Sequence, residues 1–153
     1  MHPDTEFKHE EYLERVEKIN QFIENQHKKD IQTADDIKLL VDTFYEHVKL
    51  NAVIGPIFTT AVPVDWAHHL PKMYKFWGSI LLGEHSYEGN PMQRHIEISG
   101  ITAMGAEEFS EWLLVFTSTV HSLFEGKKAK EAIIRAGNIA RLMLHNIEQK
   151  KKP

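Results

Sequence analysis

Apolar side chains recur every three or four residues along most of the chain, and no stretch shows the strict alternation of a half-buried strand. Glycine and proline are sparse and fall between the periodic stretches. The pattern predicts helices over about residues 6–26, 33–48, 64–82, 107–124 and 128–149. The sequence therefore predicts an all-α protein with five main helices.

The second of these helices has a clear start signal. Thr33 is followed three residues later by Asp36, which is typical of a capping box. Tyr45 lies on the flank of the apolar stripe that follows, so its ring is expected to be buried and its hydroxyl to need a partner. After this helix, Gly55-Pro56 is predicted to interrupt the helical pattern and lead into a short linker that ends near Pro63.

Two neighbouring histidines in the third helix have different predicted environments. Apolar residues share one face of this helix with His69, whereas His68 lies on the polar stripe. His68 is therefore expected to face solvent and His69 to point into the core. Spacing alone favours a core histidine with backbone partners over a functional one.

The segment from Gly83 to Gly105 is unusually long for an irregular connection, which makes it a candidate functional region. Asn90-Pro91 is a suitable N-cap and first-turn pair for a short helix over Met92–Ile96. His95 falls on the inward face of this helix. Taken alone it is an ordinary partly buried histidine, yet imidazole is also the commonest proximal ligand of haem iron.

Trp112 lies within the apolar stripe of the fourth long helix, and its indole N–H can only donate a hydrogen bond. Either Trp112 or Tyr45 by itself is most simply a core residue. If both converged with His69 on one cavity, they would supply hydrogen-bond donors in an otherwise apolar pocket. A partly anionic oxygen molecule bound to iron requires such donors.

Composition excludes several other classes of function. The 153 residues fit one domain, and the formal net charge of −4 disfavours a nucleic-acid binder. The absence of cysteine removes thiolate metal sites, cysteine nucleophiles and c-type haem attachment. No membrane-spanning apolar run, signal-peptide core or glycine-rich phosphate loop is found, so a cytoplasmic protein without membrane contact is expected.

An ordered set of segments resembles the group III truncated haemoglobins, from about Ile37 to Ile147 or roughly three quarters of the chain. The segments are Phe44–Glu46, Gly55–Phe58, Trp66–His69, Phe76–Trp77, Tyr87–Pro91 running on to His95, and Phe109–Trp112. No single segment is specific, but their order and intervals are. The absence of Gly-Gly pairs, which mark the other truncated groups, agrees with group III.

The resemblance implies a globin-like two-over-two helical sandwich around b-type haem (iron protoporphyrin IX). It implies that His95 is the proximal iron ligand, that Tyr45 and Trp112 are distal hydrogen-bond donors, and that His69 is a distal gate. The residues expected to wall the haem are Phe44, Phe58, Trp66, Met73, Phe76, Trp77 and Met92.

The first residues extend beyond the short start that is usual in this family. We expect an N-terminal helical extension over residues 1–30 and a truncated globin domain over residues 31–150. The amphipathic pattern of the extension predicts an extra helix packed on the domain, for which the resemblance gives no role.

The function expected from the resemblance is binding of oxygen, nitric oxide or another small diatomic gas at a histidine-ligated iron. Nitric oxide dioxygenation and peroxidase-like activity both remain open, and no residue identifies a reductase that would restore ferrous iron. The alternative is a haem-free globin-like sensor or interaction module. The presence of His95 together with Tyr45, His69 and Trp112 disfavours that alternative.

Overall fold

A computed structural model of the chain describes residues 8–25, 28–61, 65–83 and 105–151. All regular structure in these residues is helical, which confirms the predicted all-α class. The elements are α1 (His9–Asn25), α2 (Ala34–Leu50), the π-helix η2 (Ile57–Ala61), α3 (Trp66–Leu82), α5 (Ala106–Leu123) and α6 (Lys127–Lys151). The short helix expected at Met92–Ile96 lies outside the described residues.

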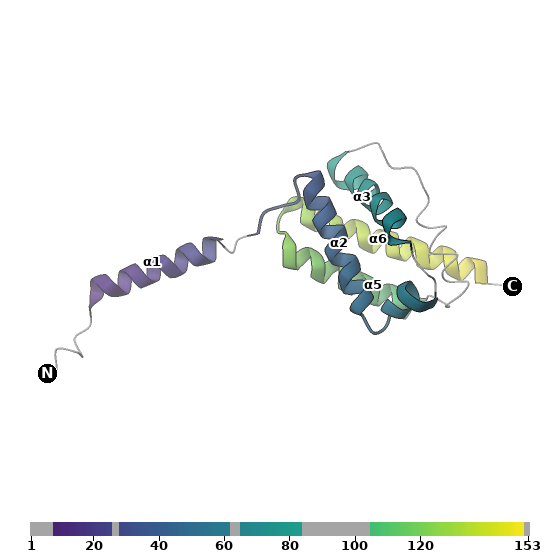
Figure 1. The fold of residues 1–153 in the computed structure, drawn as a ribbon, viewed down its shortest axis with the longest axis horizontal. Coiled ribbons are helices and arrows are strands. Elements are labelled where there is room, and N and C mark those ends of the chain that lie inside the picture. Colours follow the sequence, from purple (N-terminus) through teal and green to yellow (C-terminus); the bar gives the residue numbers. More distant parts are fainter. Residues whose placement is uncertain (1–7, 26–27, 62–64, 84–104, 152–153) are drawn as a thin grey trace.

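Four helices form a closed ring of contacts (Figure 1). Helix α2 packs against α3 and α5, and α6 packs against α5 and α3. The pair α2/α3 therefore covers the pair α5/α6, and each helix turns its apolar stripe toward the space between the pairs. This is the two-over-two helical sandwich that the resemblance to truncated haemoglobins implied.

The start of α2 is held by the predicted capping box. Thr33 Oγ1 accepts a hydrogen bond from the Asp36 N–H at 3.2 Å, and the Asp36 carboxylate accepts from the Thr33 N–H at 3.0 Å. The same carboxylate pairs with Lys29 Nζ at 2.7 Å. Burial by itself disfavours ionisation of Asp36, but Lys29 and the backbone donors outweigh it and lower the pKa of this carboxyl.

A second carboxylate ties the segment before α2 to the start of α6. The two carboxylate oxygens of Asp30 accept hydrogen bonds from the backbone N–H groups of Lys128 and Ala129, each at 2.9 Å. These are first-turn donors with no partner inside the helix. Gly126, directly before α6, has φ of 136°, and a Cβ there would lie 2.6 Å from Asp30 Cγ. Only glycine allows this close approach.

The helical pattern is interrupted at residues 51–54 rather than at Gly55-Pro56. The linker expected after it is wrong, because Gly55 and Pro56 are helical and lead directly into η2. The chain turns at Asn51, whose side-chain oxygen accepts the N–H groups of Val53 and Ile54 at 2.9 and 3.0 Å. A helix can restart here because proline in a first turn has no N–H that the helix needs. The restart buries Phe58 against the core.

The predicted N-terminal helix forms, but it does not pack on the domain. Figure 1 shows α1 standing away from the other helices, and it contacts none of the described elements. Tyr12, Leu13 and Ile19 on this helix remain 51%, 50% and 57% exposed. The four helices of the sandwich bury their apolar stripes against one another without any contribution from α1. None of the described helices is long and apolar enough to cross a membrane.

We predict that Gly126→Ala destabilises the protein by about 1–3 kcal/mol, because alanine is strained at this φ and its methyl group displaces Asp30 from the start of α6. Gly137→Ala is the matched control, since that glycine is inside α6 with open space around it. The control is expected to gain up to about 1 kcal/mol from helix propensity. Urea unfolding followed by circular dichroism measures both changes, and equal midpoints for the two variants would contradict the prediction.

Candidate functional site: an aromatic cluster with buried polar groups

Ring side chains from four elements pack together between the two helix pairs, and we call this group the aromatic cluster. Its members are Phe44 and Tyr45 of α2, Phe58 of η2, Trp66, His69 and Trp77 of α3, and Trp112 and Phe116 of α5. All are buried except Trp66 and His69, which are half-buried. Residues far apart in the sequence thus converge on one site.

Tyr45 and His69 form the polar contact of the cluster. Tyr45 is only 5% exposed, and its hydroxyl lies 3.1 Å from His69 Nε2 across the α2–α3 contact. Burial raises the pKa of the Tyr45 phenol, so the hydroxyl stays protonated at neutral pH and can donate. His68 is exposed, as predicted for the polar face of α3, whereas His69 points inward.

Trp112 presents an unpaired hydrogen-bond donor inside the cluster. The side chain is 6% exposed, and among the described residues its indole N–H has no hydrogen-bond partner. Leaving a buried donor unpaired costs about 1–3 kcal/mol. Phe44 separates Trp112 from Tyr45, with ring centroids 5.7 Å from the one and 4.9 Å from the other. A ligand with an acceptor atom would satisfy this donor.

Lys49 covers one edge of the cluster, a feature that the sequence pattern did not identify. Its Nζ lies 4.5 Å from the centre of the Trp66 ring and 3.1 Å from Glu46 Oε1. Trp66 in turn contacts the rings of Tyr45 and His69, with centroids 5.2 and 5.8 Å away. A lysine on the polar side of one helix gives no local signal that it will meet a tryptophan of another.

Some of the remaining residues predicted to wall the haem lie in the described part of the chain and others do not. Phe76 contacts Trp77, with centroids 5.4 Å apart, and Met73 is buried on the same helix. Met92 and His95 lie outside the described residues, so the predicted iron ligand stays a prediction.

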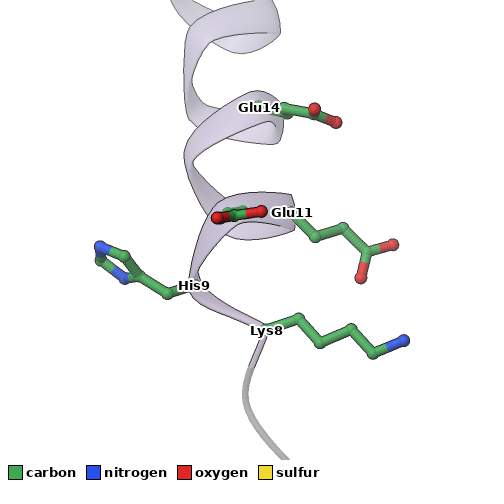
Figure 2. Close-up of a pocket in the computed structure, with 5 residues that line it drawn as sticks. Lys8, His9, Glu11 and Glu14 are labelled. Carbon is green, nitrogen blue, oxygen red and sulfur yellow. The ribbon is translucent and has the colours of Figure 1, made fainter.

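A depression on α1 offers no comparable site. Figure 2 shows the side chains that line it, and His9 points to the side of the helix opposite Lys8 and Glu14. Its lining residues are Lys8, just before this helix, and four residues of the first turns of the helix, so the depression is open to solvent. Within the described ranges, no group of histidine and carboxylate side chains is arranged to hold a metal ion. The aromatic cluster is therefore the candidate site.

A two-over-two helical sandwich that buries polar-tipped aromatic residues defines a protein of the globin type. The sequence profile of the bacterial-like globins matches residues 29–146, and the chain therefore belongs to this family.

Two further matches assign the chain to a group within this family. A group 3 truncated hemoglobin of Campylobacter jejuni is 30% identical over 109 residues, which cover 69% of this chain and 84% of the relative. The crystal structure of a group III truncated hemoglobin from Campylobacter jejuni superposes with a TM-score of 0.69 at 26% identity, covering 82% of this chain and 99% of that structure. The predicted membership of group III is confirmed. The family implies a haem cofactor and a role in binding diatomic gases such as oxygen.

Proposed function

We propose that the chain is a truncated haemoglobin that binds oxygen reversibly at the iron of a b-type haem held by His95. The observation that carries the proposal is the buried N–H of Trp112, which has no partner among the described residues and lies in the same aromatic cluster as the Tyr45–His69 contact. A donor-only group in an apolar site is costly unless an acceptor arrives. A diatomic ligand with partial negative charge is such an acceptor, and a haem-free interaction module would have no use for this donor.

The described residues fit a flat, apolar cofactor. Rings of Phe44, Phe58, Trp66 and Trp77 would wall it, together with Phe76 and Met73; Met92, outside the described residues, is expected to join them from the resemblance. The haem iron supplies the position at which a diatomic gas binds. His95 would hold the iron through one ring nitrogen, while a carbonyl or water on the other nitrogen would fix the orientation of the ring.

Three residues of this chain would act on the ligand. Tyr45 and Trp112 would donate hydrogen bonds to it from two different helices, and His69 would control access. His69 is half-buried, and a hydrogen bond to Tyr45 and ring contacts to Tyr45 and Trp66 hold it in place. Breaking one such hydrogen bond costs about 0.5–1.5 kcal/mol, so a swing of the imidazole is energetically accessible.

The first prediction is that the purified protein carries one b-type haem, seen in its Soret band and pyridine haemochrome spectrum. His95→Ala should abolish or severely weaken haem retention, because it removes the proximal ligand. His68→Ala is the matched control, since His68 is exposed and should leave haem content unchanged. A normal ferrous spectrum in His95→Ala would show that another residue holds the iron.

The second prediction is that Tyr45→Phe and Trp112→Phe each speed oxygen release by about 10- to 100-fold. A hydrogen bond to a charged acceptor in a dry site contributes about 1.5–3 kcal/mol, and ~1.4 kcal/mol is a factor of ten. Carbon monoxide is less polar when bound and should respond much less. The double variant should show non-additive effects, because both donors serve the same ligand. Stopped-flow measurements of oxygen release test this. Oxygen off-rates within about twofold of the parent in both single variants would mean that Tyr45 and Trp112 only pack in the core and do not bind the ligand.

The third prediction separates a gate from a direct stabiliser at His69. His69→Leu should change the ligand association rate more than the dissociation rate. Leucine cannot form the hydrogen bond with Tyr45 that holds the His69 side chain in its present position. His68→Leu on the exposed face is the control and should change neither rate. Flash photolysis gives both rates. Unchanged association with much faster dissociation would mean that His69 binds the ligand directly.

A further inference from the structure

A tyrosine–carboxylate pair lies where α2 meets α3, outside the residues assigned to ligand binding. The Tyr74 hydroxyl of α3 donates a hydrogen bond to Asp42 Oδ1 of α2. Both side chains are half-buried, so they lie between the core and solvent. Burial and the Asp42 carboxylate raise the pKa of Tyr74 to about 12, so the phenol is protonated at neutral pH and its proton already points at a base.

This arrangement favours one-electron oxidation of the phenol. A tyrosine that loses an electron becomes a strong acid and must lose its hydroxyl proton in the same event. A carboxylate that already accepts this hydrogen bond can take the proton without any rearrangement. The pair therefore has the chemistry of a redox-active tyrosine rather than that of a simple surface contact.

Trp77, a member of the aromatic cluster, lies one helical turn from the pair. Tyr74 and Trp77 are three residues apart on α3, a spacing that makes them neighbours on one helix face. The Trp77 ring stacks on Phe116 with centroids 4.8 Å apart and planes inclined by 20°. Phe116 stacks on Trp112 at 5.8 Å and 11°, so a single phenyl ring separates the two indoles.

We propose that Tyr74, with Asp42 as its proton acceptor, reduces an oxidised Trp77 and thereby carries oxidising equivalents from the aromatic cluster toward the protein surface. One electron passes from Tyr74 to the indole radical cation of Trp77, which returns to neutral tryptophan. The Tyr74 O–H bond breaks, and the proton binds Asp42 Oδ1. The products are a neutral tyrosyl radical and a neutral Asp42 carboxylic acid, so charge and atoms balance.

The initial oxidant is a one-electron oxidant of the peroxide-derived class that takes an electron from Trp77. The step from Tyr74 to Trp77 needs only the residues described above. It therefore stands or falls independently of the oxygen-binding function proposed for the same pocket.

Flash photoionisation of tryptophan in the full-length protein tests the transfer. A Trp66→Phe background confines the radical to Trp77 and Trp112, because the chain has three tryptophans. We expect the tryptophan radical absorbance to decay while tyrosyl radical absorbance grows, at a rate independent of protein concentration. Adding Tyr74→Phe should remove most of this growth. Tyr12→Phe, on the exposed face of α1, is the matched control and should leave it unchanged.

Asp42→Asn distinguishes proton acceptance from a structural contact. Asparagine can still accept the hydrogen bond through its amide oxygen, but it cannot take the proton. The tyrosyl growth should slow by about tenfold or more, as expected when a charged acceptor is lost, and its solvent deuterium isotope effect should change. Circular dichroism checks that both variants are folded. Tyrosyl growth at the parental rate and yield in folded Tyr74→Phe, or an unchanged rate in folded Asp42→Asn, would overturn the proposal.

Discussion

The buried indole N–H of Trp112 is the constraint around which the aromatic cluster is organised. The side chain is enclosed by aromatic rings, and none of the described groups accepts a hydrogen bond from its N–H. An unpaired donor costs about 1–3 kcal/mol. Burying one large apolar side chain contributes about 1.5–3 kcal/mol, so the packing of Phe44 and Phe116 around Trp112 offsets that cost. The fold thus holds a donor in a fixed position, and a ligand that bound there would gain the hydrogen bond without an ordering cost.

Helix α2 distributes the cluster between its two neighbours. Consecutive helical residues point about 100° apart, so Phe44 and Tyr45 face different partners. Phe44 meets Trp112 and Phe116 on α5, whereas Tyr45 meets His69 on α3. This division requires α2 to contact α3 and α5 at once, which the closed ring of four helices provides.

The edges of the cluster carry charge while its interior stays apolar. Lys49 lies over Trp66 at one edge, and the carboxylate of Asp42 receives the Tyr74 hydroxyl at the contact between α2 and α3. A buried unpaired charge would be costly, so both charged groups remain half-buried and keep a partner. Ligand binding and electron transfer would therefore both use the rings of the aromatic cluster. Electron transfer would depend in addition on the Tyr74–Asp42 pair, which ligand binding does not need.

Sequence by itself determined the features that depend on neighbouring residues. The helices, the Thr33–Asp36 capping box and the inward face of His69 follow from helical periodicity and from caps only a few residues long. Periodicity could not predict the position of α1, because the apolar stripe of one helix carries no information about which surface that helix packs against. Only the tertiary structure decided the contacts between elements: Tyr45 with His69, Lys49 with Trp66, Asp42 with Tyr74, and Asp30 with the start of α6. These partners are far apart in the chain or on different helices, and they meet only because the helices close into a ring.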